Sequence, residues 1–322
     1  MQQKINHLLE KLMPLITPIS VVIGVVFSAF LKDFSYLIPW IFAFMTFAGS
    51  LSSNIKSLTE VITRPIPIVV GMSILHVIMP LWAWSVGHIA FQGDVYTITG
   101  MILGMVIPTG ITSFIWVSIH KGNIPMTLSL ILIDTILSPL IVPFSISLLI
   151  GTKIEMDSLS IMHGLLGMIV IPSLAGMLLN QLSKGKVTKT LSPRLAPFSK
   201  ISLGFVVMLN GAVVAPYLKI IDLKLISITL VVFLIALSGY LFSFLIGKVM
   251  KFDRATVTSL TFLGGMRNIS AGAVIAVSYF PAAVAVPVVV GMLFQQVLAS
   301  LYGHFLDQYY NKKVVQQQST FL

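Results

Sequence analysis

The chain has 322 residues, of which 57% are hydrophobic and only 9% are charged, whereas a soluble domain has about 25% charged residues. This composition excludes an ordinary soluble enzyme, a disordered protein and a fibrous repeat, and it indicates a polytopic membrane protein. The formal net charge is +10, but the positive residues lie between apolar runs and form no basic patch with aromatic residues. We therefore expect the lipid bilayer, not a nucleic acid, as the macroscopic partner.

Apolar stretches of membrane-spanning length follow one another along the chain. A transmembrane helix needs roughly 20 mostly apolar residues. The stretch 122–152 contains one charged residue, Asp134, and is predicted to be one span. The stretch 255–306 contains Arg267, and Pro281 divides it into two spans because proline favours helix ends. With the seven charge-free stretches, this predicts an all-α protein with ten transmembrane helices. The charge-free stretches are 12–31, 34–55, 65–93, 95–120, 158–183, 201–218 and 225–247.

Lysine and arginine predict the orientation. With ten spans, fifteen of these residues fall on the side of the termini and only four, Lys32, Lys153, Lys219 and Lys224, on the other side. Positive residues accumulate on the cytoplasmic side of membrane proteins. We therefore expect a multi-pass protein of the cell membrane with both termini, and a basic loop at 183–200, in the cytoplasm.

The boundary at 151–158 leaves five predicted spans on each side, so residues 1–152 and 153–322 would form two repeats of opposite orientation. The fourth span of each half contains helix breakers, at Pro108-Thr109-Gly110 and at Gly264-Gly265. Matched breaks in the two halves of a transporter indicate a transport site. The alternative is that these glycines only allow close helix packing, but the pairing of the breaks and the nearby Arg267 favour the transport site.

Asp134 and Arg267 are the two ionised residues that fall deep within predicted spans. Each costs about 2.5–3.5 kcal/mol at a span centre, so each indicates a functional site. Arg267 could attract an anion, with Asp134 as its counter-charge or as a proton site. The alternative is a structural salt bridge between the fifth and ninth spans.

Other polar residues in the spans give weaker signals. His76 and His163 lie deep but have no metal-ligand spacing and no obvious partner, so packing explains them best. Gln295 and Gln296 could line the same cavity as the breaks or join two helices. We expect no cofactor, no obligate protein partner and no enzyme activity, because no nucleophile and base cluster together.

Four segments, in this order and spacing, resemble the bile acid:sodium symporter family: Pro108-Thr109-Gly110-Ile111-Thr112-Ser113, Lys121-Gly122-Asn123, Leu137-Ser138-Pro139-Leu140 and Gly265-Met266-Arg267-Asn268. The resemblance implies a panel domain of spans 1, 2, 6 and 7 and a core domain of spans 3–5 and 8–10. Spans 4 and 9 would break and cross in the core. It also implies substrates that are organic anions, either bile-acid-like or small keto or hydroxy acids.

The chain departs from the sodium-binding residues of that family. Residues with oxygen ligands are replaced by Leu75, Phe114, Ile131, Leu263 and Arg267. Sodium needs several oxygen ligands, which these side chains cannot supply.

The remaining sodium candidates are Ser113, Thr127 and Asp134. The sequence therefore predicts a secondary transporter of an organic anion that works by alternating access and is not strictly sodium-coupled. The alternatives are a sodium symporter with a non-standard site, and a channel or sensor. The predicted substrate-binding residues are Thr112, Ser113, Arg267, Asn268 and Gln296.

Overall fold

The computed structural model describes residues 15–319 except 54–64, 111, 152–153 and 155, and it describes side chains up to residue 310. This part of the chain is helical, contains no strand, and has seven helices long and apolar enough to cross a membrane. The predicted class, an all-helical polytopic membrane protein, is confirmed. The seven helices are Ser28–Ser50, Pro65–Ala90, Ile124–Ile150, Ser158–Leu182, Lys186–Leu218, Leu223–Val249 and Ala282–Tyr310, and shorter apolar helices cover Leu15–Val26, Val95–Val106 and Ile269–Tyr279.

In the first half of the described chain, the helix Leu15–Val26 is followed by further helical elements. They are α2 (Ser28–Leu31), the 3-10 helix η1 (Lys32–Leu37), α3 (Ile38–Ser50), α5 (Pro65–Ser73), the π-helical turn η3 (Ile74–Ile78), α6 (Met79–Ala90), α7 (Val95–Val106), α8 (Thr112–Ile119) and α9 (Ile124–Ile150). The second half contains α10 (Ser158–Leu165), the π-helical turn η5 (Leu166–Val170), α11 (Ile171–Leu182), α12 (Lys186–Leu218), α13 (Leu223–Val249), α14 (Arg254–Gly265), α15 (Ile269–Tyr279) and α16 (Ala282–Ser319).

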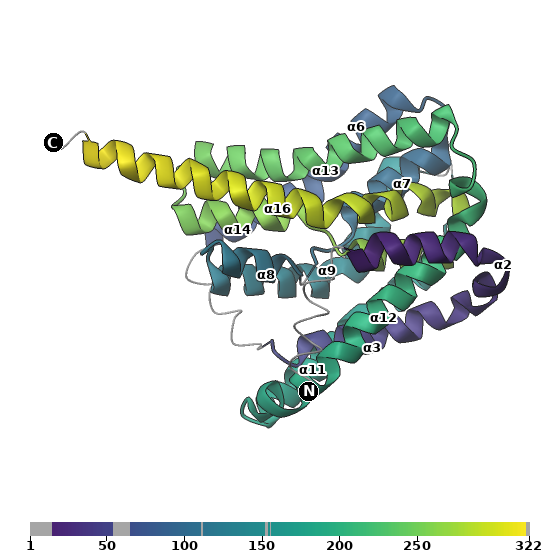
Figure 1. The fold of residues 1–322 in the computed structure, drawn as a ribbon, viewed down its shortest axis with the longest axis horizontal. Helices are drawn as coiled ribbons and strands as arrows, with labels where there is room; N and C mark the ends of the chain where they lie inside the picture. Colours follow the sequence, from purple (N-terminus) through teal and green to yellow (C-terminus); the bar gives the residue numbers. More distant parts are fainter. Residues whose placement is uncertain (1–14, 54–64, 111, 152–153, 155, 320–322) are drawn as a thin grey trace.

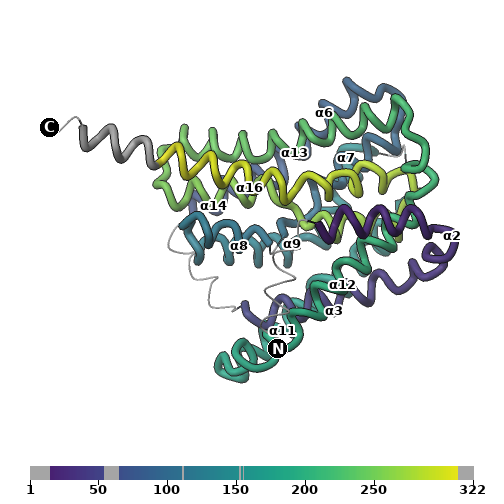
Figure 2. The backbone as a smooth tube through the Cα atoms, viewed as in Figure 1, coloured from purple at the N-terminus to yellow at the C-terminus, as the bar shows by residue number. Residues whose placement is uncertain are grey.

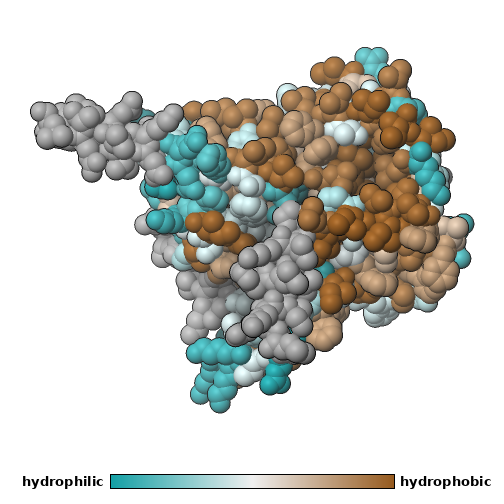
Figure 3. All heavy atoms as spheres, viewed as in Figure 1, coloured by the Kyte–Doolittle hydropathy of each residue, from teal (hydrophilic) through white to brown (hydrophobic). Residues whose placement is uncertain are grey.

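The helices form two groups whose axes diverge (Figure 1). In one group α3 packs against α11 and α12. In the other, α13 packs against α14 and α16, and Figure 2 traces α16 along α13. Apolar side chains cover much of the visible face, and hydrophilic side chains gather toward the ends of the helices (Figure 3). This distribution fits a body that is surrounded by lipid.

The predicted basic loop at 183–200 is wrong for most of its length. The turn is confined to Ser183, Lys184 and Gly185, and α12 begins at Lys186 and runs for 33 residues. Pro193 and Pro197 lie inside this helix. A charge-free stretch marks only the part of a helix that lipid surrounds, so the sequence criterion missed the basic first turns of α12.

Both predicted breaks are present, and they meet. The first separates α7 from α8, and the second separates α14 from α15. Gly110 N–H donates to the Met266 carbonyl (3.3 Å), Asn268 N–H donates to the Pro108 carbonyl (2.8 Å), and Thr109 and Arg267 form an isolated antiparallel bridge. Each break therefore satisfies backbone groups of the other, which irregular backbone inside a membrane protein requires.

Candidate functional site

A cavity of about 250 Å³ lies between the two groups of helices, next to the crossing of the breaks. Residues of α3, α11 and α12 line one side, and residues of α9, α16 and the breaks line the other. Among the described lining residues the charged ones are Lys200 and Arg267, so the walls carry positive charge and no carboxylate. Such a cavity attracts an anion.

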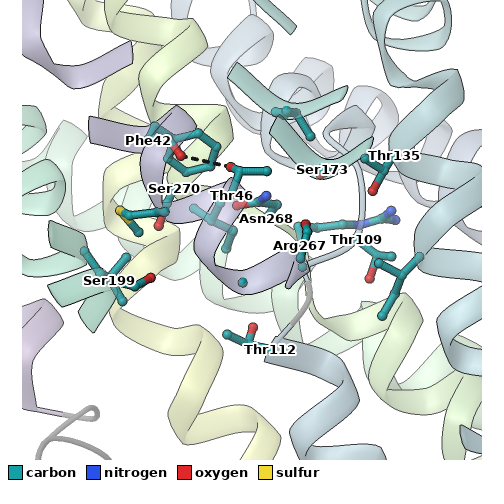
Figure 4. A pocket seen from close by; sticks show the side chains of 18 of the residues that line it. Phe42, Thr46, Thr109, Thr112, Thr135, Ser173, Ser199, Arg267, Asn268 and Ser270 are labelled. Atoms are coloured by element: carbon teal, nitrogen blue, oxygen red, sulfur yellow. Dashed lines mark hydrogen bonds between the residues drawn. The ribbon is translucent and has the colours of Figure 1, made fainter. Parts of the chain in front are cut away.

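Four of the five predicted substrate-binding residues line this cavity: Thr112, Arg267, Asn268 and Gln296, together with Gln295. Figure 4 shows the Arg267 side chain running from the break toward Thr109 and Thr135. Ser113 does not line the cavity; it is fully buried, and its Oγ donates to the Gly110 carbonyl (2.7 Å).

Arg267 is held by a carbonyl that a proline leaves free. In η3 the Met79 N–H bonds to the Ile74 carbonyl, five residues earlier. The next bond of this kind would join residue 80 to the Leu75 carbonyl, but Pro80 has no N–H. The Leu75 carbonyl instead accepts from Arg267 Nη2 at 3.1 Å. The family resemblance implies that Leu75 replaces a side chain that binds sodium. In this structure Leu75 instead offers its backbone oxygen to Arg267.

The rest of the guanidinium has no partner among the described residues. Arg267 is 1% exposed, and its Nε and Nη1 atoms make no hydrogen bond to the described residues. Buried charged donors are normally paired, because leaving one unpaired is costly. Arg267 lines the cavity, but both atoms are themselves buried, so a carboxylate bound there could accept from them only once the side chain turns into the cavity.

Two helix N-termini also border the cavity. Thr112 begins α8, and Asn268, Ile269 and Ser270 form the first turn of α15. Asn268 caps α15, its Oδ1 accepting from Ala271 N–H (3.3 Å). The N-terminal ends of helices carry partial positive charge, so both α8 and α15 add to the field of Arg267.

Asp134 and Arg267 lie near each other but do not form a direct ion pair. Asp134 is fully buried, and its charge acts on Arg267. Its two oxygens have other partners: Thr109 N–H donates to Oδ2 (2.7 Å), and His76 Nε2 lies 2.8 Å from Oδ1. The geometry therefore does not favour the alternative of a structural salt bridge. The Asp134 carboxylate instead binds a backbone N–H of the first break, that of Thr109.

The partner of His76 was missed at the level of sequence. His76 and Asp134 are 58 residues apart and lie on different helices. The sequence shows only that a histidine and an aspartate each lie deep in an apolar stretch. It does not show that the two residues are neighbours, because that depends on how their helices pack.

The three sodium candidates do not surround one ion. Thr127 and Asp134 are seven residues apart on α9, or about 10 Å along its axis. Thr127 Oγ1 donates to the Asn123 carbonyl (2.7 Å) and contacts Ser259 Oγ (3.0 Å), which is a different environment from that of Asp134. In the described part of the chain, no three His, Asp or Glu residues gather as metal ligands.

The glutamines have partners on other helices. Trp116 Nε1 donates to Gln296 Oε1 (3.0 Å), and the Gln295 carbonyl accepts from Tyr240 Oη (3.1 Å). Gln295 Oε1 is buried and has no partner among the described residues. Gln296 thus joins two helices by its side chain, Gln295 does so only by its main-chain carbonyl, and both residues line the cavity.

Comparison with known proteins identifies the relatives of this fold and site. The family model of the sodium bile acid symporter family matches residues 39–221. The chain belongs to this family. It is 54% identical to the uncharacterized protein YbaS of Bacillus subtilis, over 95% of this chain and all of the relative.

More distant relatives carry functional names. The chain is 24% identical to the uncharacterized sodium-dependent transporter YocS of Bacillus subtilis, over 92% of this chain and 91% of the relative. It is 27% identical to the probable sodium/metabolite cotransporter BASS1 of Arabidopsis thaliana, over 78% of this chain and 62% of the relative. The family and these names indicate a transporter, not an enzyme.

Proposed function

We propose that this protein is a secondary transporter of an organic anion that works by alternating access. The observation that carries the proposal is the buried guanidinium of Arg267, beside a cavity with cationic walls, whose Nε and Nη1 atoms lack partners among the described residues. The N-termini of α8 and α15 point to the same ligand charge. Asn268, Thr112 and Gln296 supply neutral contacts.

The size of the cavity favours small acids over bile-acid-like molecules as substrates. Pockets for drug-sized ligands hold about 300–1,000 Å³. At about 250 Å³, this cavity suits a small keto or hydroxy acid better than a bile-acid-like molecule. Met45, Met177 and Met292 provide an apolar wall for the body of such an acid.

The architecture that goes with this function is ten membrane-spanning segments in two inverted repeats, residues 1–152 and 153–322. Matching local features support the repeat. Asp94 caps α7 and binds the Thr97 hydroxyl, and Asp253 caps α14 and binds the Thr256 hydroxyl. The group containing α3, α11 and α12 would be the panel domain, and the group containing the breaks would be the core domain.

The orientation follows from the charge distribution. The excess of lysine and arginine on one side would place both termini and the turn at Ser183 in the cytoplasm. Because the chain has no native cysteine, Ser183→Cys gives a clean test. A membrane-impermeant maleimide should not label this variant in intact cells, and labelling would reverse the orientation.

Transport should not depend strictly on sodium. Arg267 places a fixed positive charge at the crossing, and Ser113, Thr127 and Asp134 cannot bind one ion together. The alternative is an ordinary sodium symporter with a non-standard site, which the names of YocS and BASS1 favour.

Counterflow in proteoliposomes tests the function. Vesicles loaded with one of several unlabelled keto or hydroxy acids should take up the labelled acid against its gradient, at equal rates in sodium and in choline. A channel would show no counterflow, and a sensor would show no flux. A saturable sodium requirement would return the protein to the ordinary symporter mechanism.

A further inference from the structure

His76 and Asp134, which do not line the cavity, form a pair that binding of the anion does not use; Asp134 is fully buried and the His76 side chain is 10% exposed. His76 Nε2 lies 2.8 Å from Asp134 Oδ1, and the second oxygen of Asp134 accepts from Thr109 N–H. Because Thr109 N–H already donates to this carboxyl group, a carboxylate acceptor fits the pair, and we assign the hydrogen of the pair to His76 Nε2.

The other ring nitrogen of His76, Nδ1, is buried and makes no hydrogen bond to the described residues. With hydrogen on Nε2, Nδ1 carries a lone pair that no described group satisfies, which is uncommon for a buried polar atom. Imidazole is the side chain that gains and loses a proton around neutral pH. A proton on Nδ1 would make an imidazolium directly paired with Asp134.

We infer that His76 is the coupling-ion site of this transporter and that the protein moves one proton together with each monovalent organic anion. This inference rests on the proposed function. It assigns to a proton the role that sodium has in relatives named as sodium-dependent.

Charge balance explains why the two ligands would move together. Without ligands, the two charges at the crossing of the breaks, Arg267 and Asp134, sum to zero beside a neutral His76; Lys200, on the α12 side of the cavity, is left outside this sum. The anion alone makes the site negative, the proton alone makes it positive, and both together return it to zero. Net charge is costly to carry through a low-dielectric interior. The transporter can therefore change between its two orientations when the site is empty or fully loaded. It is held back when only one ligand is bound, as a symporter requires.

Among the described residues, the charged groups that bind at or next to His76 are Asp134 from α9, its direct partner, and Arg267 from the second break, which binds the carbonyl of the neighbouring Leu75. The helices α7 and α14 also pack against η3, but their titratable residues, Tyr96 and Arg254, are in their first turns, remote from the breaks.

A pH jump without any organic anion tests the proton site. Proteoliposomes on a solid-supported membrane should give a transient charge displacement when the pH falls from about 7.5 to about 6, across the range where histidine titrates. His76→Gln keeps an N–H donor for Asp134 but cannot bind the proton, so the transient should disappear. His88→Gln, on the same continuous helical segment, should keep it. An unchanged transient in His76→Gln would overturn the inference.

Accumulation of the acid found by counterflow tests the coupling. An inward proton gradient of one pH unit should concentrate a monovalent anion about tenfold in the wild type. Because the loaded site is neutral, a potassium diffusion potential should not change this ratio. The ratio should fall to about one in His76→Gln, whatever its rate of exchange, and persistence of the tenfold ratio would refute the role of His76.

The outcomes separate the two proposals. If no acid shows counterflow but the transient disappears in His76→Gln, the organic-anion function fails and the proton site stands. If counterflow is robust and a pH gradient drives no accumulation, the function stands and the coupling fails. Thermal unfolding shows whether His76→Gln folds like the wild type. If it does not, His76→Asn takes its place in both experiments.

Discussion

The two helix breaks are alike in backbone and different in charge. Each ends one short helix, starts another, and gives one N–H to a carbonyl of the other break. The first break adds Thr109, whose N–H holds Asp134 and whose Oγ1 donates to the Met266 carbonyl (2.8 Å). The second adds the guanidinium of Arg267. Satisfying the backbone needs both breaks equally, whereas the charge for recognition comes from only one of them.

The largest expected effect comes from removing that charge. Arg267→Gln should weaken binding of the transported acid by about 3 kcal/mol, or about 100-fold, since hydrogen bonds to charged groups are worth up to that amount. Binding measured by calorimetry or by competition in counterflow would show it. Arg194→Gln, on the exposed side of α12, is the matched control and should bind normally. Equal affinity in both variants would mean that the anion does not contact Arg267.

The next comparison removes the charge behind the first break. Asp134→Asn weakens the acceptor of Thr109 N–H and of His76, and should lower the free energy of unfolding by about 3 kcal/mol. Because Asp134 and Arg267 interact without direct contact, Asp134→Asn with Arg267→Gln should show a coupling of about 1 kcal/mol. Denaturant unfolding in detergent measures this cycle, and strict additivity would show that the two charges are independent.

Glycines at the two breaks differ in the space around them. A Cβ at Gly265 would overlap the ring of Tyr240, which is buried and stacked on Tyr302 at 4.7 Å, so Gly265→Ala should cost about 3 kcal/mol. A Cβ at Gly110 would lie 3.1 Å from the Arg267 carbonyl oxygen, which needs a smaller shift, of about 1 kcal/mol.

Gly104→Ala is the control for these glycines. It has no neighbour within 4 Å and should stabilise α7 by about 0.5–1 kcal/mol. Melting temperatures should therefore rank Gly104→Ala above Gly110→Ala and both above Gly265→Ala. A different order would show that the two breaks are not packed as described.

A similarly small effect concerns Asp94 and Asp253, which cap the helices that end at the two breaks. Burial, the largest influence, raises the pKa of Asp94, but hydrogen bonds from Lys224 and Thr97 and the charge of Lys224 outweigh it and hold the pKa below its ordinary value. The pKa of Asp253 is likewise lowered, because hydrogen bonds from Thr256 outweigh burial. Stability from both caps is thus present above the unfolded-state pKa and is lost as the pH falls through the folded-state pKa.

At neutral pH, Asp253→Ala should cost about 1 kcal/mol. Asp94→Ala should cost about 0.5 kcal/mol more, from the exposed ion pair of Asp94 with Lys224 (2.7 Å). Both differences from the wild type should be smaller near pH 3, at about one unit below the ordinary pKa of aspartate, and should vanish only below the lowered folded-state pKa values. Unfolding at the two pH values measures this, and a difference as large in acid as at neutral pH would mean that neither carboxylate is ionised when it caps.

Much of the fold could be predicted because its signals are local. Asp134 and Arg267 were recognised as deep charges because each interrupts an apolar stretch. The breaks near Gly110 and Gly265 and the turn at Pro281 follow from backbone rules that act over a few residues. The first turns of α12 were missed for the same reason, since hydropathy reports the surrounding solvent and not the backbone conformation.

The sequence by itself determined the membrane class, the family, the places of the breaks and the two deep charges. Only the tertiary structure decided which groups meet: Arg267 with the Leu75 carbonyl, 192 residues away, and His76 with Asp134. The first contact exists because Pro80 leaves a carbonyl without its helical donor, and helix packing brings that carbonyl to the second break. Hydropathy and helix breaking are properties of neighbouring residues, whereas the choice of a partner depends on how helices far apart in the chain pack together.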